Sequence, residues 1–260
     1  DGGDTAGPGD PGVPLCEDDA SDVAGPRLLR RLTTGEIEAS IRWAFSLDSA
    51  AWTGPALPPD PAAASGFTND ADRLRVTDAF AAELQTTATQ VAAQITEPTR
   101  LAGLLPCAAG GGADCAHMFS ATFGARLYRR PLTESELARY DELYEAVGPD
   151  EGLEGFVYWA TAALIQSPNF IYRSELGEPD GDGGYKLSPD EVASALSYTF
   201  SGGPPDEALT SLAAVGGLSS SEEILAAARE LALDDSGRPQ LGLQGRLQAF
   251  HRQWLGLSSL

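Results

Sequence analysis

The sequence predicts an all-α fold, an irregular multi-helix bundle with long Pro- and Gly-rich loops. Three observations carry this prediction. Apolar residues recur at helical spacing along most of the chain. Several of these stretches follow a Ser or Thr that has Glu three residues later, the signature of a helix start. The stretches are separated by Pro- and Gly-rich segments, and no period of 20–50 residues repeats, which makes a solenoid improbable.

The N-terminal half contains two well-marked helices and a long loop. Thr33 and Glu36 form a capping box that opens an early helix. The clearest helical spacing follows in residues 76–95 and ends before Pro98. Residues 52–74 lie between these helices and contain too much Pro and Gly for regular structure, so we expect an ordered surface loop there.

The remaining chain predicts a succession of helices. Residues 153–166 are apolar nearly all round, which is typical of a central helix surrounded by others. Residues 167–176 are compatible with an extended or a helical conformation. The other expected helices run from near Asp114 to Arg130, over 133–147 with Thr133 and Glu136 as a capping box, from Ser188 through Phe200, and over 205–214, 220–233 and 239–256.

We divide the chain into three parts on this basis. Residues 1–26 form a flexible acidic N-terminal tether, rich in Gly, Pro and Asp. Residues 27–130 form an N-terminal helical region that includes a disulfide loop, and residues 131–260 form a helical bundle region. The Gly- and Pro-rich start resembles a tether left after removal of a leader, which predicts an extracytoplasmic protein.

The charge of the chain restricts its partners. Asp and Glu number 38 against 17 Lys and Arg, a formal net charge of -21. Nucleic acid is excluded as an expected partner because phosphate binding needs clustered cations. No apolar run approaches the length of about 20 residues that a membrane span requires. With 42% hydrophobic residues the chain has enough apolar material for a sizeable core.

Two of the three cysteines predict a short disulfide ring. Cys107 and Cys115 flank the sequence AAGGGAD, whose three glycines allow the ring to close with little strain. A metal site would need further Cys or His nearby, so we favour the disulfide and an oxidising compartment. Cys16 is then left over and would pair with a segment or partner outside this chain, or remain free.

Three arginines at one predicted helix end are conspicuous in so acidic a chain. Arg126, Arg129 and Arg130, joined by Arg27, Arg30 and Arg31 near the start of the chain, could bind an anionic group or polymer. They could equally anchor internal carboxylates and the C-terminal end of the helix dipole. We favour the structural role and keep anion binding as the alternative. Scattered tryptophans such as Trp254 are likewise more typical of a core than of a sugar-binding surface.

A calcium loop is the second candidate site. Asp180, Asp182 and Glu191 occupy the first, third and twelfth places of an EF-hand-like spacing. Gly184 and Tyr185 stand where that loop needs an oxygen ligand and a glycine. An acidic surface turn, with Glu191 capping its helix, is therefore the simpler interpretation.

No catalytic set and no covalently bound cofactor is predicted. Covalent haem needs Cys-x-x-Cys-His, which residues 115–118 do not supply, and we expect His117 to be a core or partly buried residue. His251 has no Gly-x-Ser-x-Gly elbow to work with, so a catalytic triad is not predicted.

Six phrases in order resemble a known group of proteins. They include RRLTTGEIEASIRWAF (30–45), FGARLYRRPLTESELARY (123–140), ALIQSPNFIYRSELG (163–177) and FHRQWLGL (250–257). The chain is similar through these phrases to the planctomycete and myxobacterial proteins of the domain-of-unknown-function families 1587, 1595 and 1592. Ala195 departs from this pattern, because the related phrase has arginine there.

The resemblance implies a context and no agreed activity. Such proteins are exported, often linked to c-type cytochromes, and usually continue into further domains. We therefore expect a helical scaffold or interaction module of an exported assembly, with association to cytochromes as one implication of the resemblance. Its partner would be another protein, for which the resemblance suggests a c-type cytochrome, or a C-terminal portion of the same protein. The alternative is part of an extracytoplasmic enzyme that breaks down polysaccharide or another polymer and whose active site needs that further portion.

Overall fold

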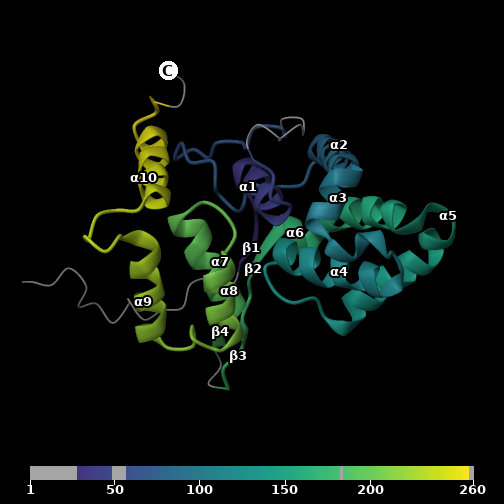
Figure 1. The fold of residues 1–260 in the computed structure, drawn as a ribbon. Coiled ribbons are helices and arrows are strands. Elements are labelled where there is room, and N and C mark those ends of the chain that lie inside the picture. Colours follow the sequence, from purple (N-terminus) through teal and green to yellow (C-terminus); the bar gives the residue numbers. More distant parts are fainter. Residues whose placement is uncertain (1–27, 49–56, 182–183, 258–260) are drawn as a thin grey trace, which may run out of the picture.

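Helices account for most of the ordered chain, as the sequence predicts. The computed structural model describes residues 28–48, 57–181 and 184–257 (Figure 1). The first half of this part contains β1 (Leu28–Arg31), α1 (Thr34–Ala44), α2 (Asp78–Ile95), α3 (Pro98–Leu104), the 3-10 turn η2 (Pro106–Ala109), α4 (Ala113–Tyr128) and α5 (Glu134–Gln166). The second half contains α6 (Pro168–Ile171), β2 (Tyr172–Glu175), β3 (Glu178–Pro179), β4 (Tyr185–Lys186), α7 (Pro189–Phe200), α8 (Glu207–Ala214), α9 (Ser221–Ala232) and α10 (Leu241–Trp254).

Capping boxes begin four of these helices. In each one the Ser or Thr side chain accepts from the backbone N–H three residues on, and the Glu at that position accepts from the backbone N–H of the cap. Two N–H groups that the helix leaves without partners are thereby satisfied. The four pairs are Thr33 and Glu36, Thr133 and Glu136, Ser188 and Glu191, and Ser220 and Glu223.

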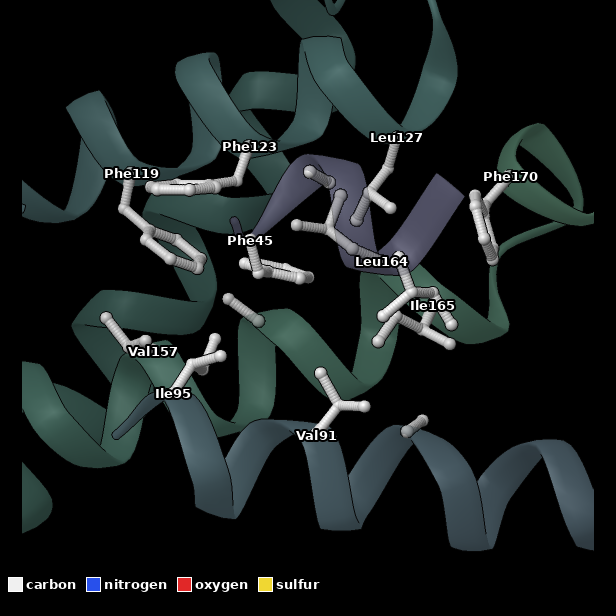
Figure 2. Close-up of a cluster of buried hydrophobic side chains, with 14 of the residues drawn as sticks. Phe45, Val91, Ile95, Phe119, Phe123, Leu127, Val157, Leu164, Ile165 and Phe170 are labelled. Carbon is white, nitrogen blue, oxygen red and sulfur yellow. The ribbon is translucent and has the colours of Figure 1, made fainter. Parts of the chain in front are cut away.

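The larger hydrophobic core is formed where α1, α2, α4 and α5 meet. Figure 2 shows Phe119 and Phe123 of α4 facing Phe45, which follows α1, with residues of α2 on the other side. The rings of Phe45 and Phe123 stack with their centroids 5.3 Å apart. Both rings are almost completely buried, and an aromatic pair in this geometry contributes roughly 0.5–1.5 kcal/mol beyond its area burial.

The expected helices at 133–147 and 153–166 form one bent element, α5. Pro149 lies inside it, and Gly152 has φ of 68°, so the two helices meet at a kink. Phe156 and Leu164 of the second part are completely buried, as expected for a central helix. Trp159, in the same part of α5, is 45% exposed. The helix at 153–166 is therefore not buried on all sides, although its sequence is apolar nearly all round.

A smaller core lies among α7, α8 and α9. It is built from Val192, Leu209, Leu218 and smaller residues. Figure 1 shows these helices and α10 on one side of the molecule and α2 to α5 on the other, with β1 and β2 between them. Tyr198 of α7 reaches the larger core, where its hydroxyl lies 2.7 Å from that of Ser40. This contact joins the two groups of helices.

Two short antiparallel ribbons complete the fold. Residues 167–176, compatible from sequence with either conformation, adopt both, since α6 is followed directly by β2. β2 pairs with β1, a strand that was not expected from the sequence. β3 pairs with β4. Strands of two to four residues are too short to show a recognisable alternation of apolar and polar side chains, so they are not detected in a mainly helical sequence.

The long loop before α2 is anchored to the start of the chain's first helix. In its described part, residues 57–74, Leu57 and Leu74 are buried. Asp60 accepts from Arg31 Nη2 at 2.5 Å and from the backbone N–H of Thr34 at 2.7 Å. The expectation of an ordered loop is confirmed there, while residues 52–56 lie outside the described part. No helix in the described ranges is long and apolar enough to cross a membrane.

Candidate functional site

The predicted disulfide is present. Cys107, in η2, is bonded to Cys115, in the first turn of α4, and their Cα atoms are 5.7 Å apart. Gly111 and Gly112 turn the chain between them with φ of 59° and 91°, which side chains rarely adopt. A disulfide is consistent with an extracytoplasmic location. Cys16 lies outside the described residues.

Arg129 serves the fold from a buried position. It ends α4 in the left-handed conformation, with φ of 60°. Its guanidinium donates to four backbone carbonyls, those of Leu127, Asn169, Phe170 and Tyr172, at 2.8–3.2 Å. Burial lowers its pKa, an effect that the neighbouring Tyr198 partly opposes. The side chain thus ties the end of α4 to the segment that becomes β2.

Arg130 and Arg126 are also held by the chain itself. Arg130 donates to both oxygens of Glu136 at 2.8 Å. Arg126 donates to the carbonyl of Ala44 at 3.0 Å and lies 3.6 Å from a carboxylate oxygen of Glu207. Together with Arg129, these contacts favour the anchoring role of the three arginines, because an external anion would have to compete with groups already in place.

A cleft of about 380 Å³ adjoins Arg129 and Arg130, between the end of α4, the segment α6–β2 and the start of α7. Arg130, Asn169, Asp190 and Glu191 contribute to its lining. Burial raises the pKa of Asp190, while Arg130 opposes the shift. Asp190 could not be predicted from the sequence, because only its partial burial distinguishes it from the other acidic residues. In this cleft the carboxyl group of Asp190 is partly desolvated, while the side chains of Arg130, Asn169 and Glu191 already hydrogen-bond to other groups of the chain.

Glu191, one of the three residues of the calcium hypothesis, is surrounded by hydrogen-bond donors. One carboxylate oxygen accepts from Ser174 Oγ and from the backbone N–H groups of Leu176 and Gly177, at 2.7–3.3 Å. The other accepts from the N–H of Ser188 at 2.9 Å. Asp180 accepts from Gly184, and Asp182 lies outside the described residues. Across the described ranges, no three His, Cys, Asp or Glu side chains are grouped as a metal would need.

The two histidines have ordinary local partners. His117 is about half exposed, and its Nδ1 lies 3.0 Å from a carboxylate oxygen of Asp141 on α5. His251 donates from Nδ1 to the carbonyl of Leu247 one helical turn earlier, at 2.6 Å. Neither arrangement presents a nucleophile beside a base, so these contacts supply no catalytic pair.

An apolar surface on α10 is the feature of greatest functional interest. Leu247, Phe250 and Trp254 recur at helical spacing on one face, and Leu255 and Leu257 follow the helix. All five side chains are 43–63% exposed, and no residue of α10 is buried. We call these five residues the α10 surface. The expectation that tryptophans belong to the core is wrong for Trp254.

A few local contacts position this surface. The ring of Phe250 stacks on that of Phe67 at 5.5 Å and on that of Trp254 at 6.0 Å. The side chain of Gln253 accepts from the N–H of Thr68 at 3.1 Å. Figure 1 shows α10 standing at the edge of the molecule, beyond α7 and α9. Helical spacing revealed the amphipathic helix, but the sequence did not show that its apolar face stays open.

Three family models match the chain. Residues 30–97 match PSD3, protein of unknown function (DUF1587), residues 115–175 match PSD5, protein of unknown function (DUF1595), and residues 187–260 match PSD4, protein of unknown function (DUF1592). No curated protein and no solved structure is significantly similar to the chain. The third matched region contains α7 to α10 and therefore the whole α10 surface.

Proposed function

Because this chain carries the DUF1587, DUF1595 and DUF1592 regions in that order, none of which has a known function, we propose that it is a helical interaction module of an exported assembly. The single observation that supports this role is the α10 surface. Five large apolar side chains are exposed together on and just after one helix. Several large apolar side chains exposed on one helix and just after it typically mark a site of protein association.

The chemistry of the α10 surface suggests the kind of partner. Phe250 and Trp254 are aromatic anchors of the type that contributes most to binding when a partner removes them from water. Arg252 on the same helix contrasts with the net negative charge of the chain. A partner with an apolar centre and an acidic rim would complement this arrangement. A c-type cytochrome is the first partner to test, given the resemblance described above.

The disulfide supports the extracytoplasmic part of the proposal. The Cys107–Cys115 bond closes a short ring that persists only where thiols are not kept reduced. A c-type cytochrome of an exported assembly would lie in the same oxidising compartment and would therefore be accessible to this chain.

Affinity isolation from the extracytoplasmic fraction of the native cells tests the interaction role. The wild-type protein is compared with the double variant Phe250→Ser, Trp254→Ser, and recovered partners are quantified by mass spectrometry. We expect one partner to be reduced at least tenfold with the double variant, because aromatic anchors dominate interface energies. Both residues are exposed, so the fold is expected to remain intact.

Val215→Ser is the matched control, since Val215 is 81% exposed and lies apart from α10, just after α8. It should retain the partner. Equal recovery with the α10 variant and the control would contradict the proposal. So would a purified, metal-free chain that turns over an ester or a polymer, which would favour the enzyme alternative instead.

A further inference from the structure

A small pocket lined by arginines lies between β1, β2, α7 and α10. Its volume is about 160 Å³, room for on the order of five waters by their share of liquid volume. Four arginines contribute to its lining, in a chain with a formal net charge of -21. We call it the arginine pocket, and these residues are Arg30, Arg31, Arg173 and Arg246.

Three of these arginines have buried N–H groups without a partner. The atoms are Arg30 Nε, Arg31 Nε and Nη1, and Arg173 Nε, and in the described part of the chain they account for four of the six buried side-chain N and O atoms that lack a hydrogen bond. Arg31 is 2% and Arg173 9% exposed. Leaving a buried cationic donor unsatisfied is costly, so these atoms mark arginines that the described residues satisfy only in part. The guanidinium of Arg31 also lies over the ring of Phe80, 4.2 Å from its centroid.

The register of the β1–β2 ribbon brings two of these arginines together. Arg30 and Arg173 are directly opposite each other, so their side chains leave the ribbon on the same face. Like charges placed this way destabilise a strand pair. An anion between the two guanidinium groups would convert this repulsion into two attractive contacts.

The acidic residues nearby do not neutralise all four arginines. Arg31 is paired with Asp60, and Arg173 with Glu175. Glu36 is the acidic residue among those that line the pocket, and its Oε2 accepts from the N–H of Thr33. No ion pair to Arg30 or Arg246 is found among the described residues. Four positive charges therefore face three negative ones.

Arg246 reaches the pocket from α10. A Cβ placed on Gly202 would lie 3.1 Å from Cδ of Arg246, so the glycine leaves the room that this side chain requires. Tyr198 and Thr199 of α7 line the pocket as well, with their hydroxyl groups already bonded to Ser40 and to the carbonyl of Ala195. Arginines from two strands and one helix thus surround one small volume.

We propose that the arginine pocket binds a small oxyanion, such as phosphate, sulfate or a carboxylate, between Arg30, Arg173 and Arg246. The planar fork of a guanidinium matches the paired oxygens of such groups. The bound anion would also connect α10 to the β1–β2 ribbon. This proposal does not depend on partner binding at the α10 surface, whose five residues are absent from the pocket lining.

Isothermal titration calorimetry on the full chain tests the site with sodium phosphate, sodium sulfate and sodium acetate, at constant ionic strength. We expect saturable binding, and the strongest of the three ions identifies whether the site prefers a tetrahedral or a carboxylate oxyanion. Arg30→Gln and Arg246→Gln should each weaken that binding about tenfold or more, in keeping with loss of a charged hydrogen bond. Both residues are partly exposed, so these variants are expected to fold.

Arg252→Gln is the matched control, because it removes the same charge from the same helix outside the arginine pocket. It should bind the ion as the wild type does. Absence of saturable binding for all three ions would overturn the proposal. Equal weakening by Arg246→Gln and Arg252→Gln would also overturn it, since the ion would then respond only to the overall charge of α10.

Discussion

Arg130 and Glu136 are joined by two parallel hydrogen bonds of 2.8 Å, across the turn between α4 and α5. The same carboxylate accepts from the backbone N–H of Thr133 and from the side-chain amide of Asn169. One side chain therefore caps α5, holds the end of α4 and contacts α6. The capping-box pattern predicts the contact with Thr133. It does not predict the contacts with the end of α4 and with α6.

Glu136 is expected to make the free energy of unfolding decrease at low pH. Hydrogen bonding from Arg130 is the main cause that lowers its pKa to about 2, from a usual value of 4.5. Because the folded pKa is depressed, the stabilisation is complete above about pH 4.5 and is lost as the pH falls toward 2. Glu136→Gln should cost about 1–2 kcal/mol at pH 7 and flatten stability against pH in this window. Urea unfolding at several pH values measures both effects.

Glu145→Gln provides the comparison, since Glu145 is exposed on the same helix. It should change the free energy of unfolding little at any pH. An unaltered acid dependence in Glu136→Gln would show that other carboxylates govern this range.

Replacement of Arg129 by lysine should be strongly destabilising. Lysine keeps the charge but cannot reach four carbonyls with one planar group. We expect a loss of about 2–4 kcal/mol in the free energy of unfolding, measured with urea, because buried acceptors are left unsatisfied. Arg139→Lys, at an exposed position of α5, should be close to neutral. Similar values for the two variants would argue against the anchoring role.

Reduction of the Cys107–Cys115 bond should lower the melting temperature. A loop closed across eight positions corresponds to a stabilisation of about 2–3 kcal/mol by chain entropy. Thermal melting with and without reductant measures the change, and Cys107→Ser combined with Cys115→Ser should abolish the reductant effect. Intact-mass analysis after alkylation reports the state of Cys16 in the same samples. A reductant effect that persists in the double variant would point to Cys16.

Removal of calcium should leave the melting temperature unchanged. The carboxylate of Glu191 already accepts hydrogen bonds from Ser174, Leu176, Gly177 and Ser188, which leaves little of it for a cation. Melting in chelator and in excess calcium provides the test. A midpoint that rises with calcium would instead support a site made with Asp180 and Asp182. Asp182→Asn should then remove that rise.

Local sequence was sufficient for most helices because their signals involve neighbouring residues. Thr133 and Glu136 are three residues apart, and each satisfies the other's backbone group without help from the rest of the chain. The disulfide loop is local for the same reason. β1 could not be predicted, because Leu28–Arg31 becomes a strand only by pairing with a segment about 140 residues later.

Function-related features depended more on distant contacts. Arg126, Arg129 and Arg130 were conspicuous in the sequence, yet their partners come from α1, α5, α6, β2 and α8. Arg173 and Arg246 could not be identified from the sequence, because no neighbouring residue indicates that they line the same pocket as Arg30. Trp254 was expected in the core, because amphipathic spacing shows which face of a helix is apolar and not whether anything covers it.

The sequence by itself determined the mainly α fold, the four capped helix starts, the short disulfide ring and the resemblance to families of unknown function. Each rests on composition or on residues close together in the chain. Only the tertiary structure decided which charged groups are satisfied internally and which apolar face remains open. Burial and the pairing of charges depend on segments that are far apart in the sequence and close together in the fold. Helical periodicity does not show which segments will pack against each other.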